Sequence, residues 1–159
     1  MIVHKNKFLN KEIPRNIILY GGTGHAMQVR PIIEYYGAKI IAIIDDAPNL
    51  ASPFSDIPIF YGYESFTAFY KTKDSCDTGF CITIGNPHGN IRLQLHDKLT
   101  NDGFIPISIA HETAWINEDV SIGPGSLILE GAIVSARVII GKQCIINSNA
   151  TVHHECVLR

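Results

Sequence analysis

The sequence predicts two domains of different class, an α/β domain followed by a parallel β-helix. Two observations lead to this prediction. Over the first 108 residues, short β-type apolar runs alternate with segments of helical spacing, and from residue 109 onward one aliphatic position recurs every six residues. A six-residue period fits neither a 3.6-residue helix nor an alternating strand, but it fits hexapeptide coils built from three short strands. We therefore expect an α/β domain over residues 1–108 and a β-helix over residues 109–159.

Composition sets the broad class of the protein. The chain has 159 residues, a hydrophobic content of 46% and a formal charge of −2 at pH 7, as an ordinary globular protein does. No basic face dominates, so no nucleic-acid partner is expected. No apolar run is long enough for a signal peptide or a membrane span, so we expect a cytoplasmic protein. The cysteines lack metal-type spacing and are expected to be small buried residues; they are Cys76, Cys81, Cys144 and Cys156.

The first elements form a βαβ unit. Asn16–Tyr20 is a short apolar β run that ends on a glycine-rich turn, and Met27–Tyr36 follows with apolar residues at helical spacing. A second β-branched run, Lys39–Ile44, ends on Asp45 and Asp46. We expect two parallel strands with a right-handed crossover and an acid pair at the carboxyl end of the second strand.

The same alternation continues to the end of this domain. Ile57–Tyr61 and Gly79–Ile84 read as strands, and Glu64–Tyr70 and Asn90–Leu99 read as helices. A last strand, Phe104–Ile109, leads into the repeats. Strands that alternate with helices indicate a small Rossmann-like α/β domain.

The repeats themselves are unbroken. The aliphatic positions, which should point inward and stack from coil to coil, are Ile116, Ile122, Ile128, Val134, Ile140, Ile146, Val152 and Leu158. A small or modest side chain stands four residues after each of the first seven. Ordinary hairpins are the alternative, but hairpins do not require a register of six. The six-residue pattern is still regular at Arg159, where the sequence has supplied fewer than three coils of eighteen residues. We therefore expect an incomplete β-helix.

The first glycine turn is the clearest candidate for a ligand site. Gly22 and Gly24 allow close approach of a phosphate, and the following helix offers free N–H groups and a positive dipole. Asp45 lies where an acid can bind ribose hydroxyls. Met27 stands where a dinucleotide fingerprint has its third glycine, so a tight turn without a ligand remains open. Asp45 and Asp46 could also be a solvated strand end.

Other polar residues fall near the same crevice. Gly85 and Asn86 end a neighbouring parallel strand, whose carboxyl end should meet the same edge of the sheet. His25, at the start of the first helix, could face a ligand, cap the helix or be solvated. Arg92 could face a phosphate or lie on the surface.

In the β-helix the unusual residues are His153, His154 and Glu155, at a corner between strands. A metal site needs three or four converging ligands, and the coils contain only one other histidine, His111. A histidine general base beside a carboxylate is chemically more sensible, because imidazole titrates near neutrality. A solvated polar corner is the alternative.

Taken in order, these motifs resemble one bacterial family. Tyr20–His25, Ile44–Asp46, Ile84–Asn86 and Val152–Val157 together are similar to sugar acyltransferases of the NeuD/PglD type, over Asn16–Leu158. The resemblance implies a Rossmann-like domain that binds a nucleotide-linked sugar and a left-handed β-helix that forms a homotrimer. It also implies acetyl-CoA as the donor, bound in grooves between neighbouring β-helices. No metal is expected, because too few ligands converge.

The resemblance also implies roles for single residues. His154 is similar to the general base of the family and Glu155 to the acid beside it. The positions similar to the sugar-nucleotide contacts are Gly22, Thr23, Gly24, His25, Asp45, Asp46, Gly85 and Asn86. The expected reaction is direct attack of a sugar amine or hydroxyl on the thioester, without a covalent acyl-enzyme.

Members of that family continue for several coils past the His–Glu pair, and those coils form much of the donor groove. The chain is therefore a fragment or a natural short form, and we expect it to bind acetyl-CoA weakly. A non-catalytic nucleotide-sugar-binding or assembly module is the alternative function. A nicotinamide oxidoreductase would rest only on the glycine turn. The sugar, the nucleotide and the choice between nitrogen and oxygen as acceptor stay open.

Overall fold

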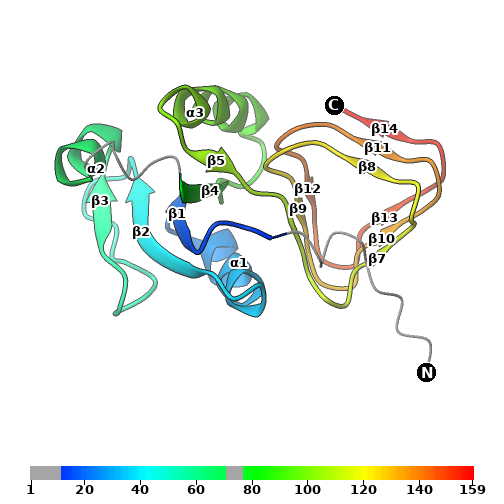
Figure 1. Ribbon diagram of the computed structural model, residues 1–159, viewed down its shortest axis with the longest axis horizontal. Coiled ribbons are helices and arrows are strands. Elements are labelled where there is room, and N and C mark those ends of the chain that lie inside the picture. Colours follow the sequence, from blue (N-terminus) through cyan, green and yellow to red (C-terminus); the bar gives the residue numbers. More distant parts are fainter. Residues whose placement is uncertain (1–11, 71–76) are drawn as a thin grey trace. The chain divides into compact units, whose positions relative to one another are not determined.

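The computed structural model describes residues 12–70 and 77–159. The described chain separates into two compact units, Ile13–Ile107 and Ser108–Arg159 with Glu12, each of which is treated by itself below. Figure 1 shows the first unit as a sheet with helices and the second as stacked coils. Cys76 lies outside the described residues.

The first unit is built on one parallel sheet of five strands in the order β3-β2-β1-β4-β5. The strands are β1 (Asn16–Tyr20), β2 (Lys39–Asp45), β3 (Ile59–Tyr61), β4 (Thr78–Ile82) and β5 (Ile105–Pro106). β1 pairs with both β2 and β4, so the strand order reverses beside β1. In open α/β sheets, ligands bind at the carboxyl ends of the strands beside such a reversal.

Helices cover both faces of this sheet. They are α1 (Gly24–Tyr35), α2 (Tyr63–Phe69) and α3 (Gly89–Asn101), and α1 and α3 lie on opposite faces (Figure 1). Because both faces are covered, Ile17, Ile18 and Leu19 in β1 are all buried. Burying each of these side chains stabilises the fold by roughly 1.5–3 kcal/mol.

The apolar spacing of the first helix predicts its buried face only in part. Val29, Ile32 and Ile33 are buried against the sheet, and Ala26 joins them. Met27, which the pattern placed on the same face, is 55% exposed. A helical step of 100° per residue puts position 27 roughly 150° from the centre of the buried face, on the side that faces solvent.

The second unit consists of strands of two residues that stack into three parallel sheets. The sheets have the orders β12-β9-β6, β13-β10-β7 and β14-β11-β8. The strands are β6 (Ile109–Ala110), β7 (Trp115–Ile116), β8 (Ser121–Ile122), β9 (Leu127–Ile128), β10 (Ile133–Val134), β11 (Ile139–Ile140), β12 (Ile145–Ile146), β13 (Thr151–Val152) and β14 (Val157–Leu158). Ile133 pairs with Trp115 on one side and Thr151 on the other, a register of eighteen residues. This stacking is consistent with the predicted β-helix.

The repeated aliphatic positions form the core of this unit. Ile128, Val134 and Ile140 are almost fully buried, and the small residues Ala132 and Val138 are completely buried beside them. The predicted inward-facing ladder is therefore confirmed where coils pack on both sides.

The cysteine prediction holds less well. Cys81, in β4, is buried, whereas Cys144 is partly exposed and Cys156 is exposed. The prediction of a buried small residue is wrong for Cys156, because it lies in the last described coil, which packs on one neighbouring coil only.

The corners of the coils have a regular backbone. Every sixth residue from position 125 has a positive φ between 57° and 76°: Gly125, Gly131, Arg137, Gln143, Asn149 and Glu155. This left-handed conformation costs a residue with a side chain about 1–2 kcal/mol, so packing of the coils must impose it.

The predicted strand Phe104–Ile109 is instead two strands in different units. Ile107 N still donates to Phe80 O in the first sheet, whereas Ile109 N donates to Ser126 O in the coils. Ser108 stands between them, and its hydroxyl donates to Gly123 O. Among residues 12–70 and 77–159, no helix is long and apolar enough to cross a membrane.

Candidate functional site

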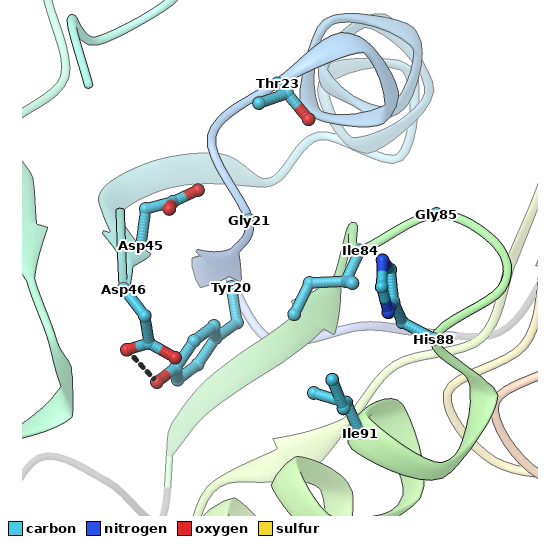
Figure 2. A pocket seen from close by; sticks show the side chains of 9 residues that line it. All are labelled: Tyr20, Gly21, Thr23, Asp45, Asp46, Ile84, Gly85, His88 and Ile91. Atoms are coloured by element: carbon cyan, nitrogen blue, oxygen red, sulfur yellow. Dashed lines mark hydrogen bonds between the residues drawn. The ribbon is translucent and has the colours of Figure 1, made fainter. Parts of the chain in front are cut away.

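A pocket of about 330 Å³ lies in the first unit where β1 and β2 end and where the loop after β4 begins (Figure 2). Its lining residues are Tyr20, Gly21, Thr23, Asp45, Asp46, Ile84, Gly85, His88 and Ile91. The pocket therefore occupies the edge of the sheet at which the strand order reverses.

The glycine turn is held between the end of β2 and Thr83, the residue that follows β4. Gly21 has a φ of 111°, and its N–H donates to Ile44 O at 2.8 Å. A Cβ at this position would lie 3.0 Å from the backbone carbon of Thr83. The Thr83 hydroxyl donates to Gly21 O at 2.6 Å. Both the dihedral angle and the close approach require glycine here.

The two aspartates at the end of β2, Asp45 and Asp46, have different partners. Asp45 Oδ2 accepts a hydrogen bond from Gly22 N at 2.7 Å, and Asp45 Oδ1 accepts one from Ala47 N at 2.9 Å. Asp46 Oδ1 accepts a hydrogen bond from the Tyr20 hydroxyl at 2.9 Å, which Figure 2 marks. Burial, and then the hydrogen bond to Asp46, raise the pKa of Tyr20 above its ordinary value. The Tyr20 phenol therefore stays protonated and keeps donating to Asp46.

Arg92 forms hydrogen bonds with the backbone of the loop after β4. Its side chain is buried, and its guanidinium donates to Ile84 O at 3.2 Å and Gly85 O at 3.3 Å. It also lies 3.5 Å from Asn86 Oδ1. The expectation of a surface position for Arg92 is wrong, because the carbonyl groups of the turn need a donor. The expectation of a phosphate contact stays a prediction.

His25 contacts the same loop from the other side. A Cβ at Gly85 would lie 3.1 Å from His25 Cδ2 and 3.2 Å from its Nε2, so the imidazole packs directly on Gly85. Its Nδ1 lies 3.0 Å from Gln28 Oε1. The ring supports the loop and does not line the pocket.

Two helices begin at the pocket. Thr23 is the N-cap of α1 and His88 the N-cap of α3, and neither side chain caps its own helix. Both residues line the pocket. Helix N-termini carry unpaired N–H groups and a positive dipole, so this part of the pocket favours an anion.

The predicted substrate-binding residues divide into two groups. Thr23, Asp45, Asp46 and Gly85 line the pocket. The others are not among the lining residues: Gly22, Gly24, His25 and Asn86.

Sequence reasoning did not single out Tyr20, Gly21, Ile84, His88 or Ile91 as lining residues. Tyr20, Gly21 and Ile84 stand inside the motifs and could have been found by following each strand to its last residue. His88 and Ile91 lie at the start of α3, and no motif in the sequence marks them as pocket residues.

The candidate catalytic residues lie in the second unit, at the corner between β13 and β14. His154 Nδ1 is 3.4 Å from Glu155 Oε2, and both side chains are exposed to solvent. Arg137, in the coil before, places its guanidinium 2.8 Å from Glu155 Oε1. Within the described chain, no group of three or more histidine, cysteine or acidic residues is arranged to hold a metal ion.

Comparison with known proteins adds a family match. Residues 16–99 match the family described as the PglD N-terminal domain. The match covers the glycine turn, the aspartate pair and the loop after β4.

Solved structures with the same fold extend through the coils. A mutant perosamine N-acetyltransferase from Caulobacter crescentus, in complex with CoA and GDP-perosamine, is 25% identical, with a TM-score of 0.76 over 89% of this chain and 64% of that one. The acetyltransferase domain of PglB from Neisseria gonorrhoeae, in complex with acetyl coenzyme A, is 22% identical, with a TM-score of 0.72 over 90% of this chain and 66% of that one. WeeI from Acinetobacter baumannii is 24% identical, with a TM-score of 0.73 over 89% and 65%. This chain thus spans a little less than two thirds of the length of these proteins. The comparisons confirm the family resemblance that the motifs predicted.

Proposed function

Because its residues 16–99 make this chain a member of the PglD N-terminal domain family, we propose that it is an acetyl-CoA-dependent sugar acetyltransferase. In this proposal the first unit is a Rossmann-like domain that binds a nucleotide-linked sugar, and the second is a left-handed β-helix that carries the catalytic residues. The observation that carries the proposal is the pocket at the strand-order reversal, which joins two helix N-termini to an aspartate pair.

The pocket fits a nucleotide diphosphate by its chemistry. Thr23 and His88 bring the N-terminal ends of α1 and α3 to it, which suits two linked phosphates. Asp46 offers a carboxylate to hydroxyl or N–H groups, and Ile84 and Ile91 offer an apolar surface. The perosamine N-acetyltransferase, whose fold this chain shares, is in complex with GDP-perosamine.

We assign the chemical step to His154 as general base. The sugar amine or hydroxyl attacks the thioester carbonyl carbon, its proton passes to the imidazole, and the carbon–sulfur bond breaks to release the CoA thiolate. The proton then passes to that thiolate. Glu155, 3.4 Å from Nδ1, orients the ring so that Nε2 is the nitrogen available to the acceptor. The sequence and the site leave both nitrogen and oxygen acceptors open.

We also propose a homotrimer through the coils. Large apolar side chains on two faces of the second unit are 43–51% exposed: Trp115, Ile133, Ile139 and Val157. Contiguous exposed apolar surface of this kind marks interaction sites. The faces meet at the corner that holds His154, so association would bring a second copy beside the candidate base.

The direct test is mass-spectrometric detection of acetyl transfer from acetyl-CoA to a panel of amino and hydroxy nucleotide sugars. Transfer to one member of the panel, lost without the protein, supports the proposal. Tight binding of a nucleotide sugar with no transfer to any acceptor would instead support the non-catalytic binding module.

A further inference from the structure

The loop after β4 forms one wall of the pocket, and a buried arginine holds its backbone. Figure 2 shows Ile84, Gly85 and His88 together on this wall. Arg92 is not among the lining residues. We propose that Arg92 is a positioning residue: it binds carbonyl groups of the loop and thereby turns the N–H groups of Gly85 and Asn86 toward the anionic part of the ligand. This inference rests on the proposed function, because it assigns groups that receive the phosphates of a nucleotide-linked sugar.

A single nitrogen atom of Arg92 serves two consecutive carbonyl groups. Nη1 donates to Ile84 O at 3.2 Å and to Gly85 O at 3.3 Å. Gly85 O also accepts the N–H of His88 at 3.2 Å. Arg92 stands in the first turn of α3 and is only 6% exposed, so packing fixes the position of its guanidinium. Both carbonyl groups therefore point toward one fixed donor.

The geometry of the peptide bond then fixes the direction of two N–H groups. The peptides that join Ile84 to Gly85 and Gly85 to Asn86 are trans, so each N–H points opposite to the carbonyl group of its own peptide. Because both carbonyl groups point at Arg92, the N–H groups of Gly85 and Asn86 both point away from it. Neither N–H group donates to another atom of the described chain. Successive N–H groups on one side of a turn form a concave site for an anion.

The charge of Arg92 favours the same kind of ligand. Arginine stays protonated in proteins, so a buried positive charge lies against this loop. The dipole of α3 disfavours a cation in its first turn, and burial adds the cost of desolvation. An anion in the pocket offsets both costs, and the N-terminal ends of α1 and α3 attract the same anion. The loop wall therefore suits a phosphate group better than a neutral part of the ligand.

The first experiment needs no variant. Hydrogen exchange of single amides is followed by NMR in the full chain, alone and with saturating UDP, GDP or inorganic pyrophosphate. The N–H groups of Gly85 and Asn86 should exchange rapidly in the free protein. With a bound probe they should exchange at least about tenfold more slowly, because each then donates to a phosphate oxygen. Binding of a probe without slower exchange at either amide overturns the inference.

The second experiment is calorimetric titration of variants with the same three probes. Arg92→Gln removes the charge and the contact with both carbonyl groups, and it should weaken binding by about tenfold to a hundredfold. Arg92→Lys keeps the charge, but its stem is one atom shorter, so its ammonium falls short of the position of Nη1. It should weaken binding almost as much, and the slower exchange at Gly85 and Asn86 should be lost. Arg15→Gln, at an exposed position, is the matched control and should bind the probes as the parent does.

The lysine variant separates positioning from direct contact. Parent affinity in Arg92→Lys with weak binding in Arg92→Gln would mean that the charge itself meets a phosphate, and it overturns the positioning role. Parent affinity in Arg92→Gln overturns this inference alone. If Arg92→Gln does not fold, Arg92→Lys and the amide exchange of the parent decide. A parent that binds none of the three probes overturns the proposed nucleotide site together with this inference.

Discussion

Arg137 and Glu155 stand eighteen residues apart and form an ion pair of 2.8 Å between adjacent coils. Both have left-handed backbone dihedral angles, so they occupy the same corner position one coil apart. Arg137 is itself tied to the coil before it, because its N–H donates to Asp119 Oδ1 at 2.9 Å. The Glu155 carboxylate beside His154 thus contacts Arg137 of the preceding coil, and the backbone of Arg137 is bonded to Asp119 one coil earlier.

The first prediction tests the proposed base. His154→Ala should lower the rate of acetyl transfer by about 10²–10⁴-fold, the usual contribution of a positioned general base. His153→Ala is the matched control, since it removes a neighbouring exposed imidazole and should leave the rate within a few fold. Steady-state kinetics at saturating acetyl-CoA measures both. Equal rates for His154→Ala and the parent would contradict the assignment.

The second prediction concerns Arg137. Both members of the ion pair are more than half exposed, and exposed pairs contribute about 0–1 kcal/mol, so Arg137→Ala should lower kcat by at most about fivefold. KM for the sugar should not change, because Arg137 acts through Glu155. In a Glu155→Gln background, Arg137→Ala should have no further effect. Independent, multiplying losses in the double variant would show that the two residues are not coupled.

The third prediction separates backbone strain from steric clash. Gly21 and Gly37 both have positive φ, but a Cβ at Gly21 would lie 3.0 Å from the Thr83 backbone, whereas one at Gly37 meets nothing within 4 Å. Gly37→Ala should lose about 1–2 kcal/mol of unfolding free energy from its dihedral angle alone. Gly21→Ala should lose clearly more. Denaturant unfolding gives both values, and equal losses would mean that the close contact relaxes without cost.

The fourth prediction is the oligomeric state. Light scattering at micromolar concentration should give the mass of a trimer for the parent. Ile133→Glu should shift it toward the monomer by burying a charge in the proposed interface. Phe69→Glu, at an exposed apolar position on α2, is the control and should not change the mass. A parent that scatters as a monomer contradicts the proposal.

The fifth prediction concerns the cysteines and pH. Complete burial raises the pKa of Cys81 to about 12. The folded state therefore binds the thiol proton more tightly than the unfolded state, whose cysteine has a pKa near 8.5. The stability that this difference contributes is fully present below about pH 8.5 and falls as the pH rises toward 12. At pH 8, iodoacetamide followed by mass spectrometry should label the exposed Cys156 and leave Cys81 unlabelled until the protein is unfolded.

The parts of the fold that sequence predicts well are those fixed by local periodicity. The aliphatic ladder specifies the coils because each inward position repeats the same environment, and Ile128, Val134 and Ile140 are buried as expected. The βαβ unit follows equally from Asn16–Tyr20 and the glycine turn.

The parts that it misses depend on contacts between distant segments. No local pattern distinguishes Asp45 from Asp46, because their distant partners are Gly22, in the turn after β1, and Tyr20, at the end of β1. Arginine is usually found at the surface. Arg92 is buried because its guanidinium donates to carbonyl groups of the loop before α3, which its local sequence does not reveal. Ile91 enters the pocket through the placement of α3, which its own sequence does not specify.

The register of eighteen residues restricts which length changes this chain could accept. Removing eighteen residues would delete one coil and leave every remaining side chain on its own face. Removing six, for example residues 140–145, would keep the aliphatic ladder pointing inward, because the period of six survives. Glu155 would then stack on Gly131 instead of Arg137, and His154 would move to a different corner of the coils. The hydrophobic core would tolerate such a deletion, but the geometry proposed for catalysis would not.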